Sequence, residues 1–212
     1  MKDFSELASG RRSIRKFKDT DIPMDEIREF IKIATSAPSG CDSQCWKFIA
    51  IKDRGVITEI ADAVIRKLEE FLSVKKHELS DSYLESKRKM ATFFTKAPVV
   101  VAVFMTTMTY YDPVFVSALE EQGYGYDDFQ RLLAYPDLLS IGAAVQNLLL
   151  AVHEKGYGAC WMNEPAVAAD EIKKILKVDE SLKFISLIPI GVPSYTPREK
   201  NLKGLDEILQ TI

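Results

Sequence analysis

The sequence has few of the residues on which most metal sites and catalytic triads depend. Its 212 residues include two histidines, His77 and His153, and three cysteines, Cys41, Cys45 and Cys160. So few histidines leave little material for a histidine-rich metal site or a histidine-dependent triad. A small, odd number of cysteines argues against a disulfide framework and is typical of proteins in a reducing compartment.

Long apolar runs are missing too. The two longest, residues 97–105 and 182–192, are well short of the roughly 20 residues that a membrane-spanning helix needs. Residues 1–6 carry charges before any apolar stretch, so the sequence predicts no secretory signal. We therefore expect a cytoplasmic protein without a transmembrane helix.

What is present is the composition of a globular protein with no strong charge of either sign. Hydrophobic residues make up 47% of the chain and charged residues 28%, which excludes the disordered and collagenous classes. The 28 basic and 31 acidic residues leave a net charge of -3, so no overall field attracts nucleic acid or an anionic membrane. Because the chain shows no repeat, low-complexity tract or linker, residues 1–212 are predicted to form a single α+β domain.

Apolar spacing predicts the main helices and strands. Helices are predicted from Pro23 to the turn before Pro38, and over residues 57–72, 138–152 and 169–176; strands are predicted over residues 46–52, 98–105, 157–163 and 184–192. The strand at 98–105 is apolar throughout, which is typical of a central strand covered on both faces. Taken alone, the alternation of strands and helices suggests parallel βαβ units.

Two stretches lack clear periodicity. Residues 75–96 are highly charged and are predicted to form a solvated surface helix, with a lid segment as the alternative. Residues 110–126 are rich in aromatic residues and glycine, and we interpret them as a variable loop or as short helices over a pocket.

The densest charge lies in residues 11–18, Arg-Arg-Ser-Ile-Arg-Lys-Phe-Lys, where five of eight residues are basic. Arginine presents a planar pair of donors to phosphate or carboxylate, and Ser13 adds a hydroxyl donor. The segment indicates a local anion site, although an ordinary solvated turn explains its spacing equally well. The basic surface is too small for strong nucleic-acid binding.

A second unusual segment, residues 37–48, places turn-forming and short polar residues between a predicted helix and a predicted strand. Such a loop offers backbone and amide groups to a planar heterocycle, although an ordinary connecting loop is the simpler interpretation of the bare pattern. Cys41 and Cys45, with Cys160 elsewhere, provide neither a four-ligand zinc site nor a CxxC redox motif, so no metal is predicted.

Motifs of other nucleotide-binding and hydrolytic classes are absent. Residues 123–125 and 156–158 are both Gly-Tyr-Gly and do not extend to G-x-G-x-x-G, and the chain contains no P-loop sequence. It has no G-x-S-x-G elbow to supply a serine nucleophile. We assign no catalytic acid, base or nucleophile.

Four segments form an ordered set along nearly the whole chain. They are Arg-Arg-Ser-Ile-Arg-Lys-Phe at 11–17, Ala-Pro-Ser-Gly-Cys-Asp-Ser-Gln-Cys-Trp at 37–46, Lys-Ala-Pro-Val-Val-Val at 96–101, and the helix and strand at 141–151 and 156–161. Together they resemble the FMN-dependent nitroreductase family. The first resembles its Arg-Arg-Ser-x-Arg-x-Phe motif and the second its Ala-Pro-Ser-x-x-Asn-x-Gln-Pro-Trp motif; the others resemble a family strand and the helix and strand that wall the flavin site.

The resemblance implies a nitroreductase-like α+β fold: a mostly antiparallel central sheet flanked by helices in three layers. It also implies a homodimer with two FMN sites at the subunit interface. One subunit would hold the phosphate, ribityl and pyrimidine parts of FMN through Arg11, Arg12, Ser13 and Arg15. The partner subunit would supply its Pro38, Ser39, Gly40, Asp42 and Gln44.

Two further groups of cofactor-binding residues follow from the resemblance. Met162, Asn163 and Glu164 match the position beside flavin N5, where a backbone N–H tunes reduction. A basic residue near the carboxyl terminus completes the phosphate site, and Arg198 and Lys200 are the candidates.

The implied activity is that of an oxidoreductase. NADH or NADPH would reduce bound FMN, and a small planar electron-poor acceptor such as a nitroaromatic or quinone would then take the electrons. Residues 110–126, with Phe115, Tyr124 and Tyr126, are the candidate substrate lid. The same motifs fit relatives that reduce enones, dehydrogenate or dehalogenate, because the motifs bind the flavin and not the acceptor. A flavin-binding or storage protein without turnover is the non-enzyme alternative.

Three features depart from the family pattern. Asp42 stands where the family has Asn and would bring negative charge near the cofactor unless it is protonated or paired, and Cys45 stands where the family has Pro. The tail at residues 197–204 aligns poorly with the family's Arg-rich segment, so Arg198 and Lys200 both remain candidates.

Overall fold

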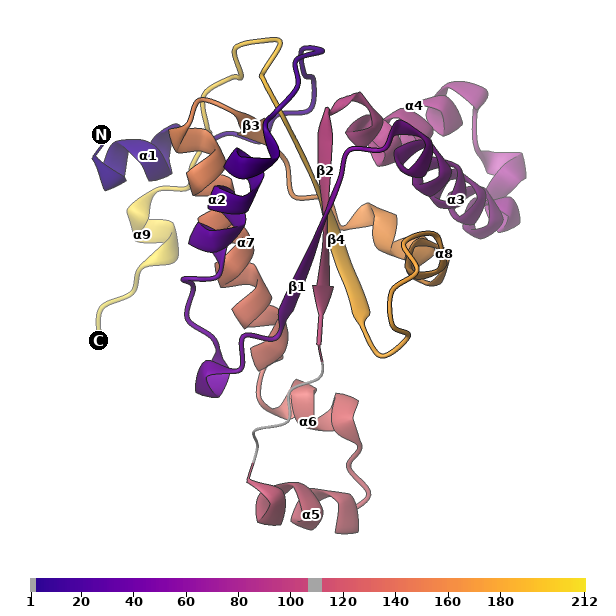
Figure 1. The fold of residues 1–212 in the computed structure, drawn as a ribbon. Helices are drawn as coiled ribbons and strands as arrows, with labels where there is room; N and C mark the ends of the chain where they lie inside the picture. The colour runs from indigo at the N-terminus through magenta and orange to yellow at the C-terminus, as the bar shows by residue number, and fades with distance from the viewer. Residues whose placement is uncertain (1–2, 107–111) are drawn as a thin grey trace.

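Four antiparallel strands lie between two layers of helices in the computed structural model, which describes residues 3–106 and 112–212 (Figure 1). The strand order is β1-β2-β4-β3, and the strands are β1 (Trp46–Ile51), β2 (Val99–Met105), β3 (Gly158–Ala159) and β4 (Lys183–Gly191). The antiparallel sheet implied by the family resemblance is confirmed, and the parallel units suggested by the strand–helix alternation are wrong.

The helix pair between β1 and β2 explains the antiparallel pairing. β1 is followed by α3 (Arg54–Leu72) and then by α4 (Asp81–Thr92), which lie side by side (Figure 1). Two helices that run out and back return the chain to the end of the sheet where β1 finished. β2 therefore runs antiparallel to β1, whereas a single crossover helix would have made the two strands parallel.

β2 is the central strand and is buried on both faces, as predicted from its apolar sequence. Because successive side chains point to opposite faces, one set packs under α3, α4 and α8 (Ala169–Ile175), and the other under α2 (Met24–Ala34) and α7 (Pro136–Glu154). The first set is Val100, Ala102 and Phe104, and the second is Val99, Val101, Val103 and Met105. The three-layer arrangement follows from these two cores.

Local signals place most helix ends within a residue or two of the predictions. Asp53 caps α3 by accepting the Val56 N–H at 3.0 Å. The prediction that Pro23 is the first helical residue of α2 is wrong, because Pro23 is the N-cap and the helix begins at Met24. The strand predicted at 157–163 is wrong in extent: only Gly158 and Ala159 form β3, and Met162 pairs with β4 through an isolated bridge.

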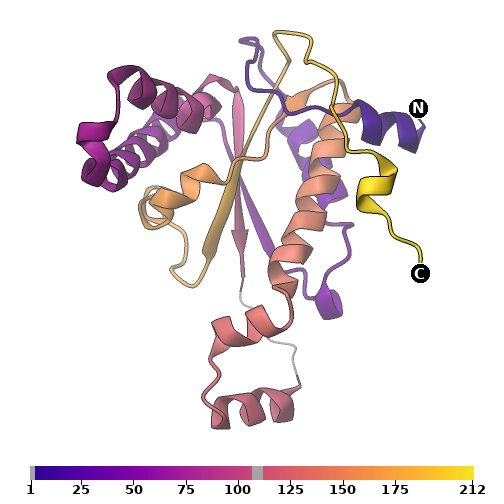
Figure 2. The ribbon, with the colours of Figure 1, turned by 180° about the vertical axis from the view of Figure 1, so that it is seen from behind.

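The remaining elements surround this core. Residues 75–96 lie in η2 (Ser73–Glu78), α4 and η3 (Phe93–Lys96), and α4 is the predicted surface helix. α5 (Pro113–Glu121) and α6 (Tyr126–Leu132) project beyond one end of the sheet (Figures 1 and 2). α1 (Phe4–Gly10) lies toward the other end of the sheet, and α9 (Leu205–Ile208) lies outside the layer formed by α2 and α7. Tyr110 of the predicted lid is outside the described residues.

No single helix among the described residues has the length and apolar composition to cross a membrane. The bent pair α6 and α7 meets those criteria only when the two helices are taken together, across a 67° bend.

A tight contact at Gly158 gives a test of the packing. A Cβ added there would lie 2.5 Å from Ile14 Cγ1 and 2.7 Å from Ile14 Cβ. Overpacking of this kind costs about 1–3 kcal/mol, so Gly158→Ala is expected to lower the free energy of unfolding by that amount in chemical denaturation. Gly142→Ala is the control, because the nearest atom to its added Cβ, on Trp161, is 3.7 Å away. Equal stability of the two variants would contradict the packing.

Candidate functional site

Residues 11–18, the most basic part of the sequence, run along the edge of the sheet beside β3. The Ile14 N–H donates to the Ala159 carbonyl at 2.9 Å, and the Lys18 N–H donates to the Val192 carbonyl at 2.8 Å. The Lys16 carbonyl accepts from the Ser194 N–H at 3.1 Å. The segment is therefore fixed to the sheet by backbone bonds and is not a freely solvated turn.

Three cations of this region form a basic cluster: Arg11, Arg12 and Lys200. The Arg12 Nε donates to the Arg198 carbonyl at 3.1 Å, and the Lys200 Nζ donates to the Ala8 carbonyl at 3.1 Å. Burial, and then the charges of Arg11 and Arg12, hold the pKa of Lys200 below its usual value. In residues 3–106 and 112–212, no ion pair joins a carboxylate to any member of the cluster. The cluster therefore carries uncompensated positive charge.

The two candidate tail residues are not equivalent. Lys200 is half-buried and brings its ammonium group into the basic cluster. Arg198 is exposed and contributes its backbone carbonyl oxygen to Arg12. The structure therefore places the Lys200 side chain among the cations.

Ser13 and Arg15 lie beside the buried thiol of Cys160. Burial raises the pKa of this thiol, while the charge of Arg15, a hydrogen bond with Ser13 and the charge of Arg11 partly oppose that rise. The thiol therefore stays protonated at neutral pH and is not a nucleophile of the thiolate kind. Arg11, Ser13 and Arg15 therefore all lie near this thiol, next to β3.

The second candidate segment is a strained loop around η1 (Gly40–Asp42). Cys41, Asp42 and Gln44 have φ values of 50°, 55° and 47°, in the left-handed region that non-glycine residues rarely adopt. The Ser39 Oγ accepts the Gln44 N–H at 3.0 Å, which closes the loop on itself. The Gly40 N–H donates to the Ser140 Oγ of α7 at 3.1 Å. These bonds hold the unusual backbone in place.

Asp42, which departs from the family pattern, has a partner in its own loop. Its Oδ1 accepts the Gln44 Nε2 at 3.2 Å. Both side chains are exposed, as is that of Pro38, while Ser39 and Gly40 are half-buried. In this chain the Asp42 carboxylate therefore faces solvent and accepts a hydrogen bond from the Gln44 side-chain amide.

One chain does not bring the two candidate segments together. The loop contacts Ser140 near the start of α7, whereas Gly10, just before the basic segment, lies near His153 at the other end, where a Cβ added to Gly10 would be 3.2 Å from the His153 Nε2. Thirteen residues separate these positions, which corresponds to about 20 Å along a helix that rises 1.5 Å per residue. The predicted flavin residues of one chain thus form two separate surfaces.

The third predicted group leaves the sheet after β3. The Met162 N–H donates to the Leu187 carbonyl and the Met162 carbonyl accepts the Leu187 N–H, both at 3.0 Å. Its N–H is therefore used within the sheet. Asn163 is exposed at the start of η4 (Glu164–Ala168), and the Glu164 carboxylate pairs with Lys87 of α4.

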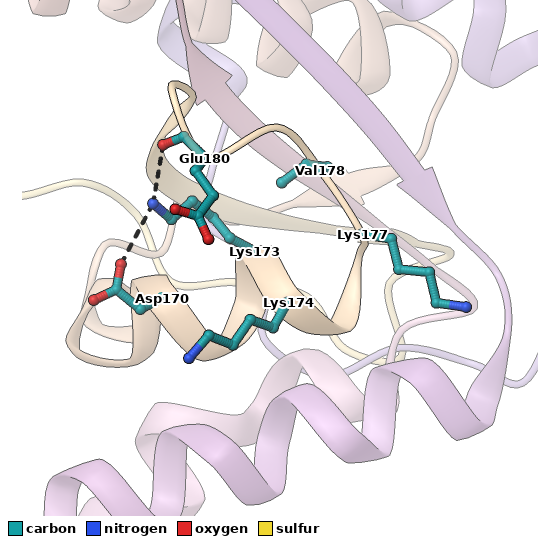
Figure 3. Close-up of a pocket in the computed structure, with 6 residues that line it drawn as sticks. All are labelled: Asp170, Lys173, Lys174, Lys177, Val178 and Glu180. Atoms are coloured by element: carbon teal, nitrogen blue, oxygen red, sulfur yellow. Dashed lines mark hydrogen bonds and ion pairs between the residues drawn. The ribbon is translucent and has the colours of Figure 1, made fainter.

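A lysine-lined pocket of about 470 Å³ lies elsewhere, against α8 (Figure 3). The Lys173 Nζ pairs with Asp170 at 3.4 Å and donates to the Glu180 carbonyl at 3.2 Å. Lys174 and Lys177 point in different directions (Figure 3). Since α8 covers the opposite face of the sheet from α7, this pocket is separate from the basic cluster.

Two residues that the sequence analysis did not single out support the candidate loop. Ser140 binds the Gly40 N–H, and the Asp137 carbonyl accepts the Cys45 thiol at 3.8 Å. Both lie at the start of α7, where short polar residues are common as helix caps. The sequence alone therefore gives no sign that Ser140 and Asp137 support the loop.

The chain belongs to the nitroreductase family. The profile of the Nitroreductase family matches residues 8–192. A BluB-like flavoprotein from Clostridium difficile 630 is 32% identical, with 100% of each chain covered and a TM-score of 0.85. Iodotyrosine deiodinase from Hydra vulgaris is 26% identical over 98% of this chain and 72% of that protein.

A further structural relative shares the fold at lower identity. It is an oxidized iodotyrosine deiodinase bound to FMN and 3-iodo-L-tyrosine, which is 23% identical, with a TM-score of 0.70 over 97% of each chain. The fold of this chain is therefore the nitroreductase fold, as the sequence resemblance implied.

The uncompensated charge of the basic cluster predicts a response to anions. Inorganic phosphate is expected to raise the melting temperature of the flavin-free protein above its value in chloride at equal ionic strength. Each 1 kcal/mol of binding stabilisation corresponds to about 2–4 °C for a chain of this size. Lys200→Gln is expected to lose most of this shift, and Lys203→Gln, which changes an exposed neighbour, is expected to keep it.

The pKa of Lys200 supplies a second readout in the same experiment. Since folding lowers this pKa, the charged lysine reduces stability at neutral pH. The cost begins to fall as the pH rises past the folded-state pKa and is gone above the unfolded-state pKa. Without phosphate, Lys200→Gln is therefore expected to be at least as stable as wild type. A clear loss of stability, or identical phosphate shifts in all three proteins, would contradict the assignment.

Proposed function

We propose that this chain is an FMN-dependent oxidoreductase. In this proposal NADH or NADPH reduces the bound flavin, and a planar electron-poor acceptor such as a nitroaromatic or quinone is then reduced in turn. The observation that carries the proposal is the basic cluster: three cations without a carboxylate partner among the described residues, fixed beside β3 of a nitroreductase fold.

The chemistry of the cluster fits a phosphate ester. Guanidinium groups bind phosphate oxygens through paired N–H donors, and a lysine adds a compact charge. Arg11, Arg12 and Lys200 would hold the phosphate of FMN. Ser13 and Arg15, which lie next along the same segment, would hold the ribityl chain and the pyrimidine edge.

Bound FMN would supply the electron-transfer chemistry, which the protein's own side chains do not have. The protein's part is to orient and to stabilise charge. Arg15 would place a fixed positive charge at the pyrimidine edge, where negative charge develops on reduction. The predicted backbone donor beside N5 would come from Asn163 or Glu164, because the Met162 N–H is used within the sheet.

The cofactor site would be completed by a second copy of this chain. The loop that holds Pro38, Ser39, Gly40, Asp42 and Gln44 meets α7 at Ser140, about 20 Å along the helix from His153, next to Gly10 and the basic segment. A partner subunit would therefore bring its loop to the flavin. The carboxyl-terminal tail supports a homodimer. Leu205, Ile208 and Leu209 are 64%, 66% and 59% exposed, and α9 buries no residue in this chain.

Dehalogenation is the second candidate chemistry. The observation in its favour is that iodotyrosine deiodinase of Hydra vulgaris aligns with 98% of this chain. Both reactions would use the same cofactor residues, so the acceptor-binding residues decide between them. The candidate acceptor segment is residues 112–132, which includes Phe115, Tyr124 and Tyr126 of the predicted lid.

The proposal predicts a coloured protein. The purified protein, or the protein after incubation with FMN, is expected to show the visible absorbance of flavin. In the absence of oxygen, NADH or NADPH is expected to bleach this absorbance, and a quinone or nitroaromatic is expected to restore it. A protein that stays colourless after incubation with FMN would sink the proposal. Bound flavin that neither nicotinamide bleaches would overturn the NAD(P)H step. Release of iodide from an iodotyrosine by the dithionite-reduced protein, with no quinone turnover, would favour dehalogenation.

The proposed dimer gives a separate prediction. A double variant, Leu205→Ser with Ile208→Ser, removes exposed apolar area that contributes about 25 cal/mol per Å² when it is buried. Sedimentation is expected to show a dimer for wild type and a shift toward monomer for the double variant at low micromolar concentration. Phe71→Ser, an exposed apolar residue of α3, is the control and is expected to remain dimeric. A wild-type monomer at all concentrations would contradict the shared site.

A further inference from the structure

The most unusual polar residue outside the basic cluster is Asp137, in the first turn of α7. Its side chain is fully buried. The Tyr126 hydroxyl donates to its Oδ2 at 2.5 Å, and its Oδ1 has no hydrogen-bond partner among the described residues. A buried carboxylate with so few partners is costly. Its position therefore needs an explanation beyond packing.

On one side, Asp137 anchors the projecting helices α5 and α6. Tyr126 is the first residue of α6, so its bond to Asp137 ties the start of that helix to α7. The Lys183 Nζ of β4 lies 4.7 Å from the centre of the Tyr126 ring and pairs with Asp127 at 3.3 Å. Phe129 packs edge-on against Phe115 of α5, with ring centres 6.1 Å apart. Through Phe129 and Phe115 the anchor reaches α5 as well as α6.

On the other side, the same turn of α7 holds the strained loop. The Ser140 Oγ accepts the Gly40 N–H at 3.1 Å and donates to the Pro136 carbonyl at 2.8 Å. The Asp137 backbone carbonyl accepts the Cys45 thiol at 3.8 Å. The candidate acceptor segment and the candidate flavin loop are therefore mounted on a single helical turn.

The backbone on both sides of this turn is strained. Ala134 and Tyr135, which connect α6 to α7, both have a φ of 57°. Cys41, Asp42 and Gln44 in the loop are also left-handed. Such conformations persist only where surrounding contacts determine them. Both strained segments meet the first turn of α7: Tyr135 directly precedes it, and the loop bonds to its Ser140.

The titratable groups that face Asp137 are Tyr126 of α6, Lys183 of β4 and the Cys45 thiol just before β1. Burial raises the pKa of its carboxyl, against the opposing effects of the Tyr126 hydrogen bond and the charge of Lys183. The charge of Asp137 also adds to burial in raising the pKa of the Cys45 thiol. A protonated or an ionised Asp137 can each accept the Tyr126 hydrogen bond, so the anchor does not depend on one protonation state.

We propose that Asp137 is a positioning residue that couples residues 112–132 to the loop at residues 39–45. The Asp137–Tyr126 hydrogen bond fixes the acceptor segment on the first turn of α7, and that turn fixes the flavin loop through Ser140 and the Asp137 carbonyl. Order in one segment thus stabilises the other. The coupling itself is a property of this chain; the names of the two segments rest on the proposed function.

Hydrogen exchange on the purified full-length protein tests the coupling. Tyr126→Phe removes one hydroxyl on the acceptor side and no atom that bonds to the loop. Because a buried hydrogen bond is lost and a buried carboxyl oxygen is left without a partner, local opening is expected to increase about tenfold. Amide exchange is expected to rise in residues 112–132 and also in residues 39–45. Tyr124→Phe, an exposed tyrosine in the same segment, is the control and is expected to leave both unchanged.

Asp137→Asn is the second variant. Its amide oxygen still accepts the Tyr126 hydroxyl, so amide exchange in this variant is expected to match that of wild type. Faster exchange confined to residues 112–132 in Tyr126→Phe would overturn the coupling, and unchanged exchange in both segments would overturn the positioning role. In the FMN-loaded protein, Tyr126→Phe is expected to raise the acceptor KM several-fold with little change in kcat. The exchange measurement needs no flavin. It therefore tests the coupling even if the proposed function is wrong.

Discussion

The burial of β2 on both faces is the constraint on which the rest of the structure depends. An apolar strand that exposes neither face requires a helical layer on each side, and side-chain alternation divides its residues between two cores. One layer must then supply a long, regular helix, and that helix is α7. Its two ends carry the two surfaces of the candidate site: the strained loop at its first turn, and the basic segment near its last.

The chemistry of the site follows from how charge is distributed on this frame. The protein has a net charge of -3, yet Arg11, Arg12 and Lys200 gather with no carboxylate partner in the described part of the chain. A cluster of like charges lowers stability unless an anion joins it. Backbone bonds fix residues 11–18 beside the sheet, and we propose that the cluster serves to bind an anionic ligand; a phosphate ester matches both the arginine geometry and the charge.

The sequence predicted those features that depend on local pattern. The apolar run of β2 predicted a central strand, and that prediction is confirmed. The charge density of residues 11–18 indicated a local anion site, which stays a prediction. Other features depend on contacts between distant residues. Nothing in the types of Asp42 and Gln44 shows that both are left-handed, because glycine or asparagine is the usual signal. Asp137 looks like an ordinary acidic residue in a first helical turn, where negative charge is common, and only the fold shows that it is buried.

The central claim is that the basic cluster binds the phosphate of FMN, and a comparison of FMN with riboflavin tests it most directly, since the two ligands differ only in that phosphate. By fluorescence titration, wild type is expected to bind FMN at least about 100-fold more tightly than riboflavin, as charge-assisted phosphate contacts imply. Lys200→Gln is expected to reduce this ratio about tenfold or more while leaving riboflavin affinity unchanged. Equal affinity of wild type for the two flavins would contradict the account.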